Sequence, residues 1–239
     1  TALKALKSAT AFDVRTVKSA TDTVAAATVS SGTPNGTYNV EVVELATANK
    51  WITNAPVAAG QTFGAGQLTL TVGGESLAID IAQGATLQDV RSAINDAARS
   101  KGVQASVLTS NDGQYLSVSS DKTGAANGIT LAFTSGGSDL QSLVGSLQER
   151  VPAADAVVRI DGLTVTASGN KITEAVPGLT LDLKAKGTSI VTVSTDTAAA
   201  SRLIPTVRYK SEVAGRGLSF RRPVAGSGRR LPAAGGERR

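Results

Sequence analysis

Short runs in which apolar and polar residues alternate recur through most of this sequence, and this two-residue period most constrains its fold. In the run TYNVEVVEL, Tyr38, Val40 and Val42 would lie on one face of a strand, and Asn39 and Glu41 on the other. This pattern predicts a half-buried strand. Further strands are predicted at 68–72, 75–81, 103–109, 114–119, 129–133, 156–160, 163–167, 179–184 and 189–194. The chain is therefore expected to be mainly β, with antiparallel sheets.

Turn signals between these runs predict how the strands are connected. Two-residue or three-residue turns are expected at 73–74 (Gly-Gly), 111–113 (Asn-Asp-Gly) and 161–162 (Asp-Gly). Residues 11–30 are rich in Thr, Val and Ser and are expected to be extended. Pro and Asn-Gly at 31–36 predict a loop before the next strand.

One segment, at about 86–99, has helical spacing instead. Thr86 lies three residues before Asp89, so its hydroxyl is expected to cap the first turn while the carboxylate complements the positive helix end. An apolar stripe follows at spacings of three and four, formed by Leu87, Val90, Ile94 and Ala97. Gly102 predicts the stop. With its neighbouring strands this helix predicts a β-β-α-β-β unit.

The order of elements predicts two small β-rich domains, one inserted in the other. The β-β-α-β-β domain is expected over 57–150, after a Pro/Gly-rich boundary at 53–67, and it ends in a short helix-like piece at 139–148. The predicted strands at 156–194 need strands to pair with, and the nearest available are those within residues 11–45. Residues 11–52 and 152–197 are therefore expected to form one discontinuous domain, a small sandwich or barrel-like sheet.

The two ends of the sequence differ from its body. Residues 1–10 place Leu3 and Leu6 three apart, as in the last turns of a helix. Residues 198–239 form an Arg/Gly/Pro-rich tail; within it, 201–239 hold 10 of the 24 basic groups and 2 of the 19 acidic ones. This composition predicts disorder. An out-of-frame or vector-derived segment is favoured over a functional basic arm for nucleic acid or anionic surfaces.

Composition excludes several classes of enzyme. The chain has no His and no Cys, so Ser-His-Asp and Cys-His catalysis, ordinary zinc sites and disulfides are excluded. Eight aromatic residues offer little for base or sugar stacking. No apolar run is long enough to cross a membrane as a helix. We expect a protein without enzymatic activity or cofactors, and without nucleic-acid binding or membrane insertion.

Four short motifs resemble functional sites but have simpler interpretations. Asp112 resembles part of a calcium loop, yet later ligands are missing and a hairpin turn is favoured. Gly64 and Gly66 lack the third glycine and the helix of a phosphate cradle, so a flexible loop is expected. Asp80 and Asp89 are expected to be separate strand and helix charges rather than an acid/base pair. The remaining motif, the glycosylation-like triplet at 35–37, is interpreted as a turn. No catalytic, cofactor-binding or metal-binding residue is predicted.

Three stretches together resemble one family. Residues 36–51 (GTYNVEVVELATANKW) resemble the first head strand of the flagellar filament cap proteins, hook-associated protein 2. Residues 68–131 are similar to the flagellin-insertion motif, which other flagellar proteins also carry. Residues 155–197 resemble the later head segment of the cap proteins. The presence of all three stretches in this order is more specific to the cap proteins than the middle motif alone.

The resemblance implies a structural role in the bacterial flagellum and in motility. Cap proteins are secreted through the flagellar type III channel and form a homo-oligomeric ring at the filament tip, where they help flagellin fold and insert. Their long terminal helices form coiled-coil legs, and two β-rich domains form the head. Residues 1–10 would then be the end of a leg helix, whereas the segment after Ala200 does not continue the returning leg.

Two alternative functions remain open from the sequence. The same head domains could serve as a surface adhesin for host mucin or glycans, since some cap proteins act in cell adhesion. The insertion motif could also belong to a junction protein or to the variable region of a flagellin. Expected partners are therefore further copies of the chain and flagellin, with junction proteins and mucin as additional candidates.

Overall fold

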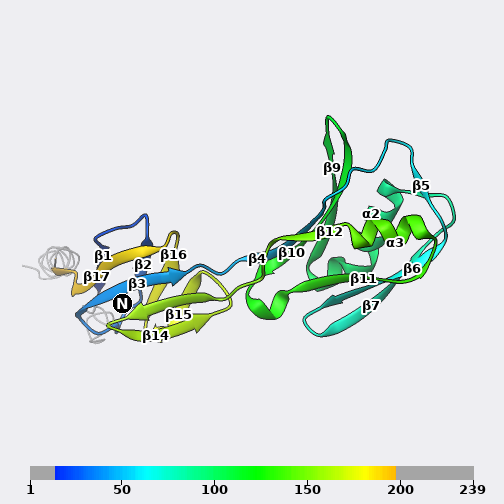
Figure 1. The fold of residues 1–239 in the computed structure, drawn as a ribbon. Coiled ribbons are helices and arrows are strands. Elements are labelled where there is room, and N and C mark those ends of the chain that lie inside the picture. Colours follow the sequence, from blue (N-terminus) through cyan, green and yellow to red (C-terminus); the bar gives the residue numbers. More distant parts are fainter. Residues whose placement is uncertain (1–13, 198–239) are drawn as a thin grey trace, which may run out of the picture.

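A computed structural model describes residues 14–197, which fold into two β-rich lobes joined by a narrow waist (Figure 1). Each lobe has its own hydrophobic core. We call the lobe with the first and last strands the sandwich lobe and the other, which carries the helices, the helix lobe. The expected mainly β, antiparallel fold is confirmed. The predictions for 1–10 and for the tail lie outside the described residues.

The sandwich lobe consists of two antiparallel sheets. The larger sheet has the order β1 (Arg15–Ser19), β17 (Gly187–Thr195), β3 (Gly36–Glu44), β13 (Ala156–Ile160) and β14 (Leu163–Ala167). The smaller sheet has the order β15 (Lys171–Val176), β16 (Leu179–Leu183) and β2 (Ala25–Val29). The core joins segments from both ends of the described chain, which is why the lobe is discontinuous in sequence.

Strand alternation decides which side chains enter this core. Val40 and Val42 of β3 are buried, as are Val191 and Val193 of β17, while the residues between them face outward. In their antiparallel register Val40 lies opposite Ser189 and Val191 lies opposite Tyr38, so inward side chains of both strands line the same face of the sheet.

The helix lobe has more elements. One sheet has the order β12 (Leu147–Val151), β4 (Ala48–Thr53), β10 (Gly113–Thr123) and β9 (Val103–Ser110). A second has the order β11 (Ile129–Gly136), β6 (Gly66–Val72) and β7 (Glu75–Ile81). The short strands β5 (Thr62–Phe63) and β8 (Ala85–Thr86) pair with each other. The helices α2 (Leu87–Ala98) and α3 (Ser138–Gly145) complete the lobe.

The predicted helix at 86–99 is confirmed. The Asp89 amide donates to the Thr86 hydroxyl at 3.4 Å, and the Thr86 amide donates to Asp89 Oδ2 at 2.8 Å, which forms a capping box. The buried residues of α2 are Leu87, Val90, Ile94 and Ala98. One turn of 3₁₀-helix follows before Gly102, whose φ of 73° ends the helix in the left-handed conformation.

The structure differs from the sequence predictions in five strands. The short strands β5 and β8 and the longer strands β4, β12 and β15 were not expected. β12 replaces the end of the helix-like piece at 139–148, because α3 ends at Gly145. β4 pairs with β10 and β12, so the end of the segment 11–52 hydrogen-bonds to the helix lobe rather than the sandwich lobe.

Candidate functional site: the waist between the lobes

The waist consists of two connecting segments that run side by side in opposite directions. The Thr47 amide donates to the Ala154 carbonyl at 2.9 Å, and the Ala154 amide donates to the Thr47 carbonyl at 3.3 Å. The Thr47 hydroxyl also donates to the Pro152 carbonyl at 2.7 Å. The two segments therefore brace each other, in contrast to a pair of independent flexible linkers.

The turn that follows β10 in the helix lobe hydrogen-bonds to both connecting segments. The Gly124 amide donates to the Thr47 carbonyl at 3.2 Å, and the Ala125 amide donates to Asp155 Oδ1 at 2.8 Å. The Thr123 hydroxyl donates to the carbonyl of Ser168, in the sandwich lobe, at 2.7 Å. These bonds connect the helix lobe to both connecting segments and to the other lobe.

Gly124 is required for this close approach. Its φ is +104°, and a Cβ built there would lie 2.8 Å from both the Cβ and the carbonyl oxygen of Ser168. Any other residue would meet backbone at this distance and adopt an unfavourable dihedral. The glycine therefore permits contact between the lobes.

Asn49 anchors the waist on the side of the helix lobe. Its side chain is 1% exposed and uses all of its hydrogen-bonding capacity. Nδ2 donates to Glu149 Oε1 at 2.7 Å and to the Val151 carbonyl at 2.9 Å. Oδ1 accepts from Trp51 Nε1 at 2.9 Å and from the Ile129 amide at 2.8 Å. One side chain thus ties β4 to β12 and to the start of β11.

Asn170 has the corresponding place in the sandwich lobe. Its Oδ1 accepts from the Ala46 amide at 2.8 Å, and its Nδ2 donates to the Ala46 carbonyl at 2.9 Å. The carboxamide thus bonds to both backbone groups of Ala46, as a neighbouring strand would. Ala46 lies where the chain leaves β3 for the waist. The effect of the carboxamide is to fix the direction in which the connecting segment departs.

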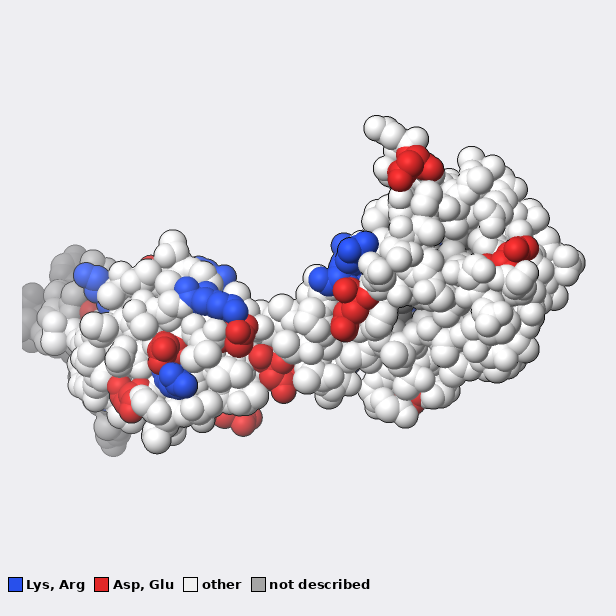
Figure 2. Space-filling view, viewed as in Figure 1, with Lys and Arg blue, Asp and Glu red and all other residues white. Residues whose placement is uncertain are grey.

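Charges on the described surface are mixed in sign. Figure 2 shows acidic and basic side chains interspersed on the face in view, without an extended patch of one sign. Arg159 lies 3.3 Å from Glu41, and Lys186 lies 2.6 Å from Glu44, in exposed ion pairs. This face gives no electrostatic indication of a nucleic-acid partner.

The structure places Asp112 in the turn between β9 and β10. Tyr115 donates its hydroxyl proton to Asp112 Oδ2 at 2.6 Å, which lowers the pKa of the Asp112 carboxyl and raises the pKa of Tyr115. Within residues 14–197 no group of three or more carboxylates could hold a metal ion. Asp112 is thus a turn residue whose carboxylate is engaged by its own hairpin.

The other sequence candidates also lie apart from one another. Gly66 belongs to β6, where a Cβ would approach the Ser135 carbonyl oxygen to 2.5 Å, so this glycine serves strand packing. Asp80 in β7 accepts from Gln67 Nε2 at 2.8 Å, whereas Asp89 caps α2. Asn35 Nδ2 donates to the hydroxyl of Thr195 at 3.1 Å and so links the loop before β3 to the end of β17.

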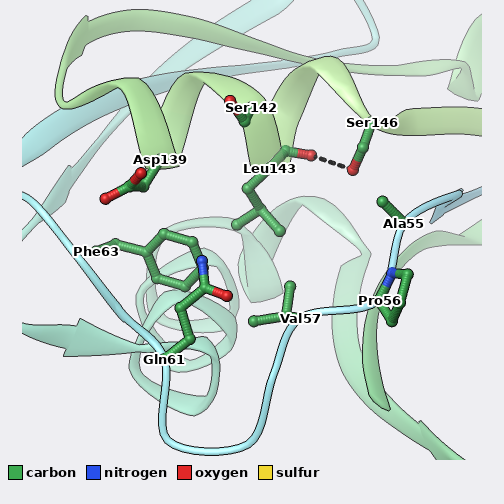
Figure 3. Close-up of a pocket in the computed structure, with 9 residues that line it drawn as sticks. All are labelled: Ala55, Pro56, Val57, Gln61, Phe63, Asp139, Ser142, Leu143 and Ser146. Atoms are coloured by element: carbon green, nitrogen blue, oxygen red, sulfur yellow. Dashed lines mark hydrogen bonds between the residues drawn. The ribbon is translucent and has the colours of Figure 1, made fainter. Parts of the chain in front are cut away.

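A shallow pocket of about 130 Å³ lies between α3 and the loop after β4 (Figure 3). Its lining residues are Ala55, Pro56, Val57, Gln61, Phe63, Asp139, Ser142, Leu143 and Ser146. The Ser146 hydroxyl is already engaged, because it donates to the Leu143 carbonyl at 2.7 Å. Asp139 is the single ionisable residue of the lining, so this pocket lacks the paired groups of acid–base catalysis.

Sequence reasoning did not find the two asparagines of the waist. Asn49 lies in a short polar interruption that looks like surface, and Asn170 follows Ser-Gly as an ordinary turn residue would. The one available signal is that Asn is unfavourable within a strand unless its carboxamide has partners. Asn49 fulfils that condition inside β4.

Three family models match the chain in order. The N-terminus of flagellar hook-associated protein 2 matches residues 1–49, the flagellin hook IN motif matches 67–122, and the C-terminus of flagellar hook-associated protein 2 matches 153–206. The B-type flagellar hook-associated protein 2 of Pseudomonas aeruginosa is 33% identical over 204 residues, which are 77% of this chain and 43% of that relative. The chain therefore spans less than half of that relative's length.

Solved structures agree with these matches. The D1-D2-D3 domains of the flagellar cap protein FliD from Escherichia coli superpose with a TM-score of 0.73 at 29% identity, covering 89% of this chain and 64% of that one. The D2-D3 domains of FliD from Serratia marcescens are 30% identical with a TM-score of 0.58, covering 68% of this chain and 94% of that one.

Two β-rich lobes braced at a hydrogen-bonded waist define a two-domain β module of the kind that forms the D2-D3 region of flagellar cap proteins. The chain belongs to the flagellar hook-associated protein 2 family, the flagellar cap proteins. In residues 14–197 no helix is long and apolar enough to span a membrane.

Proposed function

We propose that this chain forms the head of a filament cap at the distal tip of a bacterial flagellum, where it promotes flagellin folding and polymerisation. The observation that carries the proposal is the pair of lobes with its hydrogen-bonded waist, which extends over most of the D2-D3 region of solved cap proteins. A fixed relative position of two lobes suits a template for incoming subunits, because a template must keep its shape.

The proposed mechanism is one of shape and contact rather than chemistry. The lack of His and Cys and the single carboxylate in the pocket support a role without catalysis. The proposed partners are further copies of the chain in a ring, together with flagellin. The proposed location is extracellular, at the filament tip, after flagellar export.

We also propose a division into two domains that follows the two cores. One comprises residues 14–47 with 152–197, and the other comprises 48–151. This division moves the first boundary of the sequence prediction from residue 52 to the waist, because β4 pairs within the helix lobe.

A chimera tests the proposed function. Residues 14–197 would replace the corresponding head of the Pseudomonas aeruginosa relative, whose own terminal segments supply the rest, in a strain that lacks its cap protein. We expect filaments and swimming to return. The control is a protein in which the relative's two terminal segments are joined directly, without any head domains. Export of the chimera without any filament growth would contradict the proposal.

A further inference from the structure

Most sheet edges in the described residues are protected against pairing with another chain. An exposed edge strand is a template for further strands, and charged side chains or bulges on it discourage this. The charged edges are β1 with Arg15 and Lys18, β7 with Glu75 and Asp80, β12 with Glu149 and Arg150, and β15 with Lys171 and Glu174. β12 and β15 are also interrupted by register shifts.

Two further edges are covered without charges. β2 lies beside β1, and the Ser19 hydroxyl donates to the Ala25 carbonyl at 2.6 Å. β11 packs against α3, and its register shifts between Phe133 and Ser135. Both edges are therefore poor templates for a foreign strand.

Apart from the two-residue ladder of β5 and β8, which is too short to act as a template, the exceptions are β9 in the helix lobe and β14 in the sandwich lobe. Neither strand contains an ionisable residue or a proline, and each pairs with its hairpin partner without a register shift. Part of the β9 edge is closed by α2, because Asn95 Nδ2 donates to the Ala105 carbonyl at 3.0 Å and Asn95 Oδ1 accepts from the Ala105 amide at 2.7 Å. The part beyond Ala105 runs toward the hairpin end, which projects from the lobe in Figure 1.

Hairpin geometry shows which backbone groups are open. In a two-residue hairpin the residues flanking the turn bond to each other, and alternate residues then point their amide and carbonyl outward. In β9 the residues with outward backbone groups are Ala105, Val107 and Thr109. The groups of Ala105 are satisfied by Asn95, so those of Val107 and Thr109 are open. In β14 the residues with outward groups are Thr164 and Thr166. Each edge therefore offers two residues for pairing.

Exposed apolar side chains lie beside the same two edges. Leu108 of β9 is 44% exposed and Leu163 of β14 is 74% exposed. They are two of the three large hydrophobic residues exposed in the described part of the chain. A pairing of the two edges would cover both.

We propose that the β9 edge of one copy pairs in antiparallel fashion with the β14 edge of the next copy, an inference that rests on the proposed ring. The register sets Val107 against Thr166 and Thr109 against Thr164, so all the open groups of both edges are used. Leu108 and Leu163 then lie diagonally on one face, within reach of each other.

A second copy is the occupant that the structure favours, because each chain carries both edges, and their open lengths are equal. Neither edge strand brings a charge that pairing would bury. The turn carboxylates of Asp112 and Asp161 fall at the outer corners, about three strand spacings or ~14 Å apart, beyond the ~8 Å screening length. Since two different edges meet, the contact is heterologous and can close into a ring.

The contact is expected to be weak when it acts alone. Two paired residues on each side cover far less than the roughly 1,200–2,000 Å² of a stable complex. Ring closure and the rest of a cap protein would add to it through effective concentration. The test must therefore trap a transient contact.

Disulfide trapping in the full 239-residue chain meets this need, since the chain has no cysteine of its own. Ser110 and Leu163 would face each other in a non-hydrogen-bonded pair, whose Cα separation of about 4.5 Å suits a disulfide. The variant Ser110→Cys/Leu163→Cys is predicted to give a ladder of dimers, trimers and larger species under mild oxidation. The control pair, Thr16→Cys/Ser76→Cys, lies on charged edges of the two lobes and is predicted to give none.

The same samples are treated with an amine-reactive crosslinker, which reports any self-association. Amine-linked oligomers without a disulfide ladder would overturn the edge pairing and leave the proposed ring intact. Absence of both would overturn the pairing and the self-association. Equal disulfide ladders from test and control pairs would also overturn the pairing, because they would indicate random collision.

A backbone variant separates edge pairing from general proximity. Thr109→Pro in the test pair removes an outward amide that makes no bond within the hairpin, which edge strands tolerate. We predict loss of the disulfide ladder with an unchanged circular dichroism spectrum. Thr188→Ala, on the outer face of central strand β17, is the matched control and should keep the ladder. A ladder that survives Thr109→Pro would overturn the proposed register.

Discussion

The hydroxyl of Thr123 donates to the carbonyl of Ser168 at 2.7 Å, and this bond connects the last residue of β10 in one lobe to a turn of the other. It lies beside Gly124, whose amide bonds to the Thr47 carbonyl. The two lobes thus meet through a bond from a side-chain hydroxyl to a backbone carbonyl as well as through their connecting segments. Motion of one lobe against the other has to break this set of bonds.

Gly124→Ala is predicted to loosen the waist. The new Cβ would meet Ser168 at 2.8 Å in a backbone conformation that alanine disfavours, with a cost of about 1–3 kcal/mol. Small-angle scattering should show a broader range of interlobe distances, and limited proteolysis should cut near the waist. Gly74→Ala, with a φ of +82° and open space around it, is the matched control for strain alone. Equal scattering curves for the two variants would argue against a specific role of Gly124.

Asn49→Ala is predicted to destabilise the helix lobe strongly. It leaves the buried amide of Ile129 without its acceptor, at a cost of about 1–3 kcal/mol, and it also removes the acceptor of the part-buried Trp51 indole. Urea unfolding followed by fluorescence measures this directly, because Trp51 is the single tryptophan. Asn54→Ala, at an exposed position, should stay within about 0.5 kcal/mol of the parent. A similar small effect at Asn49 would contradict the assigned network.

Thr86→Ala is predicted to cost about 1 kcal/mol through loss of the helix cap. The melting temperature followed by circular dichroism gives the measure. Ser92→Ala is the control, because its hydroxyl bonds within α2 to the Gln88 carbonyl and caps no helix end. Equal losses in the two variants would refute the capping role.

Asp89 gives the cap a dependence on pH. Hydrogen bonds, first from the Thr86 amide and then from its hydroxyl, hold the pKa of Asp89 below its ordinary value of 3.8. A carboxylate with a lowered folded pKa stabilises the protein above its ordinary pKa, and this contribution is lost as the pH falls through the folded pKa. Asp89→Asn should therefore be less stable than the parent at neutral pH, and the difference should shrink below pH 3.8. A difference that is constant down to pH 2 would contradict this account.

Gly66→Ala is predicted to separate β6 from β11. The added Cβ would lie 2.5 Å from the Ser135 carbonyl oxygen and 3.0 Å from the Gly136 Cα, where backbone has no room to yield. We expect a loss of about 1–3 kcal/mol in urea unfolding. Gly145→Ala has open space around it and should change stability little or increase it. A neutral Gly66→Ala would show that the two strands tolerate separation.

The sequence predicted local structure where one short-range signal decides the outcome. The capping pair Thr86 and Asp89 defined the start of α2, and the glycines at 73–74 defined a hairpin, since both depend on residues within a few positions. The alternation in TYNVEVVEL likewise predicted the buried valines of β3. These features do not depend on the rest of the chain.

The waist could not be predicted in the same way. Asn49 is bonded to residues 100 and 102 positions away, and Asn170 is bonded across 124 positions. Nothing near either residue indicates these partners. β4 was not predicted for a related reason, because its strand pattern is clear only beside β10 and β12. Pairing between distant strands is settled by tertiary packing, which a local pattern does not report.

The claim that the two lobes form one rigid head is tested most directly by measuring the distance between them in solution. Spin labels on cysteines introduced at the exposed residues Ser76 of β7 and Thr192 of β17 would report it by pulsed double resonance, with no native cysteine to interfere. We predict a single narrow distance peak, which Gly124→Ala broadens. A broad or two-peaked distribution in the parent chain would contradict the fixed waist on which the proposed template role depends.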